Sequence, residues 1–435
     1  MGHTTDADQE YHFLQERICQ KIQGNPASPT LMKILRLLFS PEDARLASRL
    51  PHNLTPVEAL TDNLGIPLAE LNDRLTEMAQ RGVVFDLEYN GRRYVTLPPV
   101  VIGFFELVFM RTRPDLPMQE LAHLFEQYFT ENNGALAHSV WQGQTQLARA
   151  YVREETIPEN TTEVLDWERA THIISSATAI SVSICQCLHT AQHHGKGCDK
   201  PTEVCLSFNY AAESLHRNGH GRAITTKEAM DILARCKEAN LVQLGDNVQR
   251  KVSFICNCCG CCCHMLRGMR IYTSGKGVVT SNWIMEVNPA TCKGCGECAR
   301  VCPLDAIRIA GRPGEHNGKG LAIRDEHTCL GCGVCSTVCK TGSATMRSRP
   351  QRVLVPETIF DQRVAMAIER GQLADLLFDD PEKLSHRALG RVLHFLEKSP
   401  PFKAAMACSS IKSSFLHTLV RAAEKQSGDL ADVFK

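Results

Sequence analysis

Two short cysteine runs constrain this chain more than any other part of its sequence. Residues 292–303 read CKGCGECARVCP and residues 329–340 read CLGCGVCSTVCK, so each is a C-x2-C-x2-C-x3-C run. Three thiolates two residues apart can wrap a tight loop around one iron–sulfur cluster, while the fourth thiolate turns away. The glycines within the runs suit a backbone that curls close to sulfide; they are Gly294, Gly296, Gly331 and Gly333. The runs therefore predict iron–sulfur clusters, and a pair of zinc knuckles is the alternative.

The doubled run is similar to that of bacterial two-cluster ferredoxins, in which the fourth cysteine of each run ligates the other cluster. The pattern implies a first [4Fe–4S] cluster on Cys292, Cys295, Cys298 and Cys339, and a second on Cys329, Cys332, Cys335 and Cys302. One departure is visible, because Pro303 follows Cys302 whereas Lys340 follows Cys339. We expect this difference to alter loop stiffness and local charge, but not ligation.

Composition places the cysteines in a reducing compartment. The chain has 435 residues, a formal net charge of zero and 21 cysteines, of which 19 lie between Cys185 and Cys339. The start, MGHTTDADQE, has neither a basic nor an apolar segment of a signal peptide, so we expect a cytoplasmic protein with reduced thiols. The longest apolar stretch, Val100 to Met110, is short and interrupted by Glu106, which predicts no membrane span. Zero net charge recruits neither nucleic acid nor a membrane surface.

Residues 1–99 follow the element order of a winged helix. Apolar residues at helical spacing predict helices over residues 31–39, 41–50 and 68–80, and Thr55-Pro56-Val57-Glu58 predicts a capping box that opens a helix ending at Gly65. Residues 83–97 alternate like two strands around the turn Asn90-Gly91. The helix at the position of a recognition helix carries three acidic residues, so DNA binding is disfavoured relative to a structural or partner-docking role.

The rest of the chain divides into four further parts, giving a multidomain α+β protein. Residues 100–180 are expected to be a mostly helical connector, with a core stripe of Leu121, Leu124, Phe125 and Phe129. Residues 181–282 form an atypical cysteine-rich domain, 283–350 the ferredoxin-like module, and 351–435 a helical tail. A capping box at Thr225 opens a helix over residues 226–239 that buries Cys236.

Ten cysteines upstream of the module form two less familiar groups. The first group is Cys185, Cys187, Cys198 and Cys205; the second is Cys256, Cys258, Cys259, Cys261, Cys262 and Cys263. Four thiolates suffice for one closed site, so the first group predicts a [4Fe–4S] cluster or a zinc ion. Nearby histidines offer alternative ligands but are expected to face solvent or support the site; they are His189, His193, His194 and His264.

The second group leaves several interpretations open. Adjacent residues of an extended segment point to opposite sides, so Cys258 and Cys259 can hardly serve one iron site. Either the segment is shared between two metal centres on its two faces, or some thiols are spare and redox-active. A noncubane or substrate-binding cluster with an open iron, and a disulfide-exchange centre, are further alternatives. The ten thiols could ligate two more cubanes and leave two over.

Two of these segments carry a family resemblance that covers most of the chain. GKGCDKPTEVCLSF at residues 195–208 and ICNCCGCCC at 255–263 resemble segments of the 4Fe-4S dicluster-domain proteins of anaerobic bacteria, which combine a winged-helix-like front with a bacterial ferredoxin module. The resemblance implies iron–sulfur binding and little more about function. Leu188-His189 stands where a basic residue is expected, which affects the charge near that site.

These features predict an iron–sulfur electron-transfer protein, or an electron-transfer subunit of an oxidoreductase. Single electrons would pass through two ferredoxin-type [4Fe–4S] clusters and one or two further clusters, with another protein as redox partner. The chain has no dinucleotide-binding or P-loop motif, so no nucleotide site is expected. The alternatives are a redox-sensing transcriptional regulator that acts through the winged helix, and a reductase with an open-iron cluster at the CNCCGCCC segment.

Overall fold

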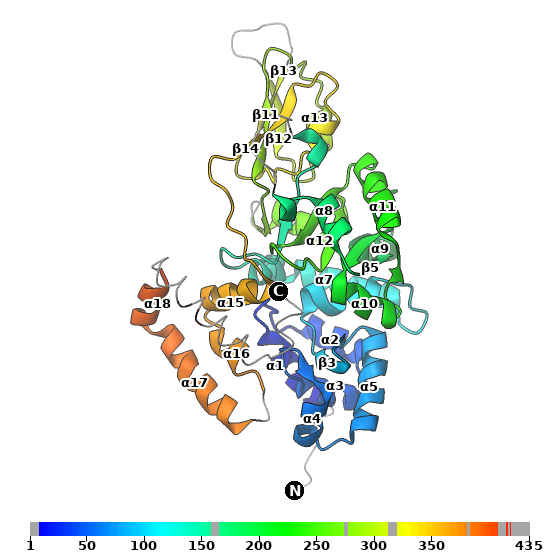
Figure 1. Cartoon of the computed structure of the whole chain (residues 1–435), viewed down its shortest axis with the longest axis vertical. Helices are drawn as coiled ribbons and strands as arrows, with labels where there is room; N and C mark the ends of the chain where they lie inside the picture. Colours follow the sequence, from blue (N-terminus) through cyan, green and yellow to red (C-terminus); the bar gives the residue numbers. More distant parts are fainter. Residues whose placement is uncertain are drawn as a thin grey trace.

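The molecule extends along one axis, with the N-terminal helices at one end and the module of the two cysteine runs at the other (Figure 1). The computed structural model describes residues 8–157, 165–273, 277–311, 320–380 and 383–407, together with 415 and 418. Helices and mostly antiparallel sheets are combined, so the fold is α+β, as predicted. Within the described ranges, no helix has the length and apolar character needed to cross a membrane.

The N-terminal unit packs helices against a small sheet. Its helices are α1 (Gln9–Cys19), α2 (Pro29–Leu38), α3 (Pro41–Ser48), α4 (Val57–Leu64) and α5 (Leu68–Arg81), and its strands are β1 (Thr55–Pro56), β2 (Phe85–Tyr89) and β3 (Arg92–Thr96). The strand order is β1-β3-β2. Asn90 and Gly91 turn the β2–β3 hairpin with φ of 49° and 72°, as their sequence predicts. The predicted helices and hairpin are present, whereas membership of the winged-helix class stays a prediction.

The predicted capping box at Thr55 was wrong. Thr55 lies in β1, where it pairs with Val95, and its hydroxyl donates to the carbonyl of Asn53 at 3.1 Å. The helix therefore starts at Val57 without a side-chain cap. The corresponding prediction at Thr225 was correct for the threonine, whose hydroxyl accepts from the backbone N–H of Glu228.

A seven-stranded sheet forms the middle of the molecule, in the order β10-β4-β8-β9-β6-β5-β7. The strands are β4 (Ala148–Ala150), β5 (Ile180–Ile184), β6 (Glu203–Phe208), β7 (Arg222–Ala223), β8 (Val242–Asp246), β9 (Phe254–Cys258) and β10 (Val278–Val279). The helices between them are α8 (Ala170–Ser176), α9 (Gln186–His193), α10 (Asn209–Arg217), α11 (Thr226–Glu238) and α12 (His264–Ile271). Strand β4 comes from the region expected to be a helical connector, so the sheet draws on both sides of residue 180.

The remaining part of that connector is helical and belongs to the N-terminal core. It contains a short turn at Val100–Phe104, α6 (Phe105–Phe109) and α7 (Met118–Val140). The predicted stripe on α7 is buried, from Leu121 to Phe129, and packs in one core with the N-terminal helices. Two 3₁₀ turns, Glu154–Thr156 and Asp166–Glu168, follow β4.

The cysteine-run module consists of two similar halves. Each run contains one helical turn, α13 (Glu297–Arg300) or α14 (Val334–Thr337). Strand β11 (Trp283–Val287) pairs antiparallel with β14 (Ala344–Ser348), and β12 (Ile307–Gly311) pairs antiparallel with β13 (Gly320–Arg324). The two hairpin-like pairs carry both cysteine runs at the far end of the molecule (Figure 1).

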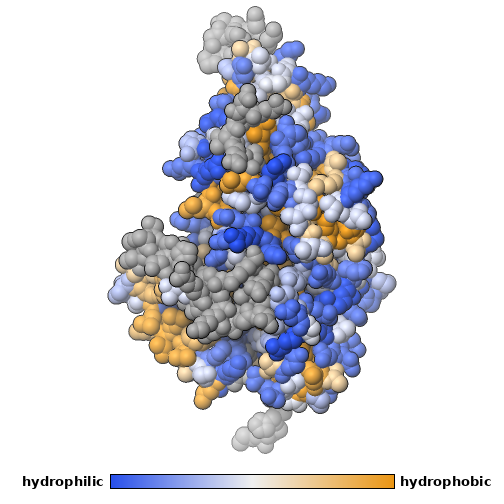
Figure 2. All heavy atoms as spheres, viewed as in Figure 1, coloured by the Kyte–Doolittle hydropathy of each residue, from blue (hydrophilic) through white to orange (hydrophobic). Residues whose placement is uncertain are grey.

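The chain then returns to the body through α15 (Ile359–Arg370), α16 (Leu373–Leu377), α17 (Leu384–Lys398) and α18 (Pro400–Ala407). Gln362 on α15 donates through Nε2 to the carbonyls of Gln146, Leu147 and Asn247, which fixes the helix beside β4 and β8. The apolar face of α17 is largely exposed, including Leu389 and Val392, and it forms an orange patch at the lower left of Figure 2.

Candidate metal centres

The first group of module cysteines combines the two runs. Burial raises the pKa of Cys298, and the neighbouring thiols of Cys292 and Cys339 raise it further. Cys339, from the second run, therefore lies beside thiols of the first run. Cys295 belongs to the same loop and is exposed. The first group of the module therefore reaches solvent at Cys295.

The second group is more deeply buried and also combines the runs. Burial raises the pKa of Cys332 to about 12, and the thiols of Cys302 and Cys329 raise it further. Cys335 is affected by the same three thiols. All four cysteines line one small apolar cavity. Cys302 of the first run thus lies with the second run, and Cys339 of the second run lies with the first. The ferredoxin pattern requires this arrangement.

Two equivalent glycines show that these loops fit close to other backbone. Gly294 and Gly331 have φ of 66° and 74°, which favours glycine. A Cβ at Gly294 would lie 2.1 Å from the carbonyl oxygen of Gly320, and one at Gly331 would lie 2.0 Å from that of Trp283. The donor sets are all thiols, as [4Fe–4S] clusters require. The residues of both groups therefore fit such clusters.

Two arginines bring positive charge to the second group. The backbone N–H of Arg153 donates to the carbonyl of Cys332 at 3.1 Å, and its buried guanidinium donates to Thr337. Arg349 donates to the carbonyl of Cys329 at 2.7 Å. Burial lowers the pKa of both arginines, and the thiols of the group counteract that shift. Both cations would offset the negative charge of thiolates and sulfide.

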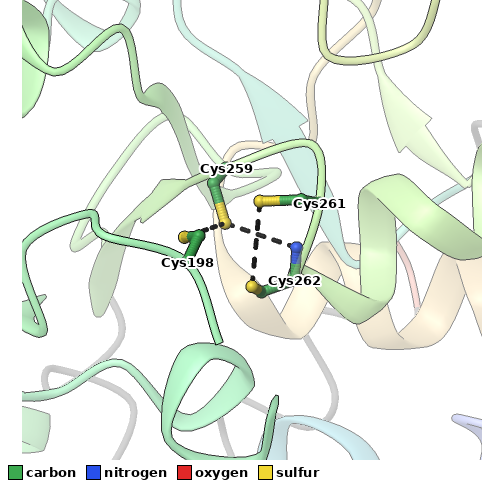
Figure 3. Close-up of side chains that lie close together, drawn as sticks. All are labelled: Cys198, Cys259, Cys261 and Cys262. Atoms are coloured by element: carbon green, nitrogen blue, oxygen red, sulfur yellow. Dashed lines mark hydrogen bonds between the residues drawn. The ribbon is translucent and has the colours of Figure 1, made fainter. Parts of the chain in front are cut away.

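The ten upstream cysteines also separate into two groups, but differently from their order in the sequence. Cys198, Cys259, Cys261 and Cys262 form a four-thiol group whose sulfur atoms all lie within 4.8 Å of one another (Figure 3). Cys198 comes from the loop after α9, and the other three come from the turn between β9 and α12. The Sγ atoms of Cys198 and Cys259 are 3.8 Å apart, as are those of Cys261 and Cys262.

Hydrogen bonds within the four-thiol group favour a thiolate at Cys259. The backbone N–H of Cys262 donates to the sulfur of Cys259 at 3.4 Å, and the nearby thiol of Cys262 together with this bond lowers the pKa of Cys259 to about 5. Burial raises the pKa of Cys261 to about 11. A thiolate is the form of cysteine that binds metal, so the group contains one preformed ligand.

The other six cysteines form a second, buried set, the six-thiol group. Its members are Cys185, Cys187, Cys205, Cys256, Cys258 and Cys263, and all of them line one large apolar cavity of about 340 Å³, which Cys259 of the four-thiol group also reaches. Cys258 and Cys259 thus belong to different groups, as do Cys262 and Cys263. This is the arrangement expected if the segment serves two centres on its two faces, which was one of the alternatives open from the sequence.

The candidate histidines take other partners. The ring of His189 lies 2.8 Å from the carbonyl oxygen of Phe109, and that of His194 lies 2.8 Å from the carbonyl oxygen of Ala122. His264 lies 3.6 Å from Glu126, and the ring of His193 packs near His189. The structure therefore places no histidine in the four-thiol group of described residues.

Glu106 is a site residue that the sequence reasoning treated only as an interruption. It lines the cavity, and its Oε2 accepts from the backbone N–H of Gly103 at 2.8 Å. Burial raises the pKa of Glu106 to about 7, and the nearby thiol of Cys256 raises it further. A lone carboxylate inside the apolar stretch of residues 100–110 was the signal that could have identified it.

Apolar side chains join the module to the upstream groups. Leu304, Leu330 and Val334 of the module pack in one cluster with Cys258 and Cys263, and Cys332 lies against the same cluster. The turn between the two upstream groups touches the module as well, because a Cβ at Gly260 would lie 2.9 Å from Pro303. Pro303 follows Cys302, so the second module group and the upstream thiols are neighbours.

Comparison with known proteins identifies the module. Residues 291–343, which span both cysteine runs, match the family model of the 4Fe-4S dicluster domain. No curated protein and no solved structure matches the chain. The match implies [4Fe–4S] clusters in the module, and with the upstream thiols it places the chain among iron–sulfur proteins. More narrowly, the two-cluster module indicates iron–sulfur electron transfer.

Proposed function

We propose that this chain is an electron-transfer protein, or the electron-transfer subunit of a redox complex, that relays single electrons between two ferredoxin-type clusters and further clusters on the upstream thiols. The first cluster would use Cys292, Cys295, Cys298 and Cys339, and the second Cys329, Cys332, Cys335 and Cys302. None of the twenty described cysteines forms a disulfide, in keeping with thiols that are reduced and bind metal in a cytoplasmic protein.

The contact between the second module group and the upstream thiols carries this proposal. The apolar cluster of Leu304, Leu330 and Val334 separates the two sets of thiols without an intervening domain. Cys295 is exposed at the other end of the series, where a redox partner protein can approach. The order is therefore an exposed cluster, a buried cluster, and then the upstream groups.

A variant of the second cluster tests the relay. We expect Cys302→Ala to remove or alter the second cluster and to slow reduction of the upstream clusters by a protein donor at least tenfold. Freeze-quenched EPR spectroscopy under anaerobic conditions measures this rate. Cys236→Ala, which changes a buried thiol of α11 outside all four groups, is the matched control. Equal rates in Cys302→Ala and the wild type would refute the relay.

A reductase is the second candidate, favoured by the cavity. The space of about 340 Å³ is lined mainly by apolar side chains, adjoins six thiols and contains the buried Glu106. Such a cavity suits a small apolar substrate that accepts electrons at a cluster and a proton from a nearby acid. Candidate molecules that bind there should change the EPR signal of an upstream cluster. No change across a panel of such molecules would count against a reductase.

A DNA-binding regulator is not favoured by the N-terminal unit. Four of its arginines form ion pairs with acidic side chains: Arg74 and Arg81 with Asp43, Arg92 with Glu58, and Arg93 with Asp86. The hairpin also packs on α10, where Tyr89 and Tyr210 are 5.7 Å apart. Salt-dependent binding to duplex DNA that changed on cluster oxidation would reverse this preference.

A further inference from the structure

The six-thiol group contains more ligands than one cubane can use. A [4Fe–4S] cubane takes four thiolates, one for each iron. The four-thiol group already accounts for Cys198, Cys259, Cys261 and Cys262. The other six upstream thiols all line one cavity, at whose edge Cys259 of the four-thiol group also lies, so the six are explained together.

If the group held a cubane, four of its thiols would be ligands and two would be unused. The contacts among the six thiols do not divide them in this way. Electrostatic interactions between neighbouring thiols connect five of them in series: Cys205 with Cys256, Cys256 with Cys258, Cys258 with Cys263, and Cys263 with Cys187. Cys185 lies beside the middle of this series, where it interacts with Cys256 and Cys263. Therefore no two of the six thiols stand apart from the other four as a disulfide-forming pair or as spare thiols.

The secondary structure explains why the six converge. Leu206 of β6 pairs with Ile255 of β9, and the antiparallel register therefore places Cys205 opposite Cys256. Cys256 and Cys258 are two residues apart in β9, so they share a face of the sheet. The remaining three thiols lie at the starts of two helices.

Those helix starts supply positive electrostatic potential to the group. Cys185 and Cys187 begin α9, and Cys263 precedes the first residue of α12. The backbone N–H of His264 lies 3.5 Å from the sulfur of Cys187 and points to it. Free N–H groups at helix N-termini stabilise thiolates. Several thiolates can therefore coexist in this buried place once a metal cluster compensates their charge.

The spread of the six thiols excludes a single metal ion. Across the described part of the chain, the four-thiol group is the one set of three or more ligands whose atoms all lie within 4.8 Å of one another. The six thiols are more widely spaced and surround part of a cavity of about 340 Å³. A group of this shape fits a body larger than one ion.

We propose that the six-thiol group binds one iron–sulfur cluster larger than a cubane, made of two cubane halves linked through a shared sulfide. In such a cluster one iron of each half is bound to the shared sulfide, which leaves three irons in each half, and six in total, for cysteine. The number of thiols in the group equals that number. This inference rests on the proposed function only in requiring that the upstream thiols bind iron.

Six single variants and an iron count test the inference. The anaerobically reconstituted full chain should contain about 16 irons from two module cubanes and one eight-iron cluster, and the four-thiol group should add either one metal ion or up to about four more irons. Each of the variants Cys185→Ala, Cys187→Ala, Cys205→Ala, Cys256→Ala, Cys258→Ala and Cys263→Ala should change the same Mössbauer and EPR component. Cys236→Ala is the control that should change nothing, and Cys198→Ala should change a different component.

The possible outcomes separate this inference from the proposed function. If any two of the six variants keep full iron content and an unchanged spectrum, the group holds an ordinary cubane, and the larger cluster is refuted while the relay stands. If the wild type holds only about eight irons, both the larger cluster and the upstream relay are refuted. The unchanged signal of the module clusters shows in each variant that the chain is folded.

Discussion

Single side chains beside the clusters should set how easily those clusters accept an electron. Arg153 is buried against the second module group, and its charge stabilises the reduced, more negative form of a cluster. We therefore expect Arg153→Gln to lower the reduction potential of that cluster by tens of millivolts, since ~1.4 kcal/mol corresponds to about 59 mV for one electron. A redox titration followed by EPR measures the shift. Arg250→Gln removes an exposed arginine, paired with Glu357, and should leave the potential unchanged.

His220, which follows α10 and contacts α5, should make the stability of the folded chain depend on pH. Its ring is buried and lies 2.8 Å from the carbonyl oxygen of Ala79. Burial lowers the pKa of His220 from 6.5 to about 4, so the unfolded chain takes up a proton at a higher pH than the folded chain. Stability is therefore complete above pH 6.5 and falls as the pH drops toward 4, by up to about 3 kcal/mol. Denaturant midpoints should show a smaller acid-side loss in His220→Gln than in the wild type.

The sequence was most informative where a residue's role depends on its neighbours in the chain. Gly294 and Gly331 could be assigned because the tight turns of the cysteine runs demand glycine, and the structure gives both a positive φ. Thr225 caps its helix as predicted. Thr55 does not, because pairing with Val95, forty residues away, draws it into a strand. Local patterns do not reveal such a competing partner.

At the scale of elements, one buried carboxylate joins the hairpin of the N-terminal unit to α10. Asp86 on β2 accepts hydrogen bonds from Arg93, Ser214, Arg217 and Asn218. Its side chain is almost completely buried. This network fixes the N-terminal unit to the sheet layer, which supports a structural role for that unit.

Removing this carboxylate should detach the unit without affecting the module. Asp86→Ala leaves two arginines and an amide without their acceptor, and we expect a loss of about 3–5 kcal/mol in unfolding free energy. Glu88→Ala is the matched control, because Glu88 is exposed on the same strand and should cost less than about 0.5 kcal/mol. Chemical denaturation followed by circular dichroism gives both values. A small effect of Asp86→Ala would show that the unit is held by other contacts.

Element pairing also limited what the sequence could reveal about the upstream thiols. Cys198 and Cys259 are sixty-one positions apart and meet only because the α9 loop folds over the turn after β9. Likewise, Cys205 meets Cys256 through the register of β6 with β9. The alternation of side chains along an extended segment predicted that Cys258 and Cys259 point to opposite sides and belong to different metal sites. The order of strands in the sheet determines which distant cysteines lie beside Cys258 and Cys259. That order could not be predicted, because β4 has only three residues, all buried, and gives too short a sequence signal.

At the scale of the whole molecule, the thiols are graded from exposed to enclosed. Cys295 and Cys261 are exposed, whereas Cys258 and Cys263 are buried. After anaerobic removal of iron by a chelator, we expect an alkylating reagent to modify Cys295 and Cys261 first and the buried Cys258 and Cys263 among the last. Mass spectrometry of peptides over time measures the order. With iron bound, the same ligand cysteines should be protected, so simultaneous modification of all sites would contradict the grading.

The pairing of β11 with β14 has a consequence for the two ends of the dicluster segment. Trp283 lies opposite Ser348, so the chain leaves the body and comes back to it at adjacent points. Beyond the return, α15 rejoins the body beside β4 and β8, where Gln362 is held. The two ends of the dicluster segment therefore lie side by side, and a short linker should suffice to join the residues that flank it.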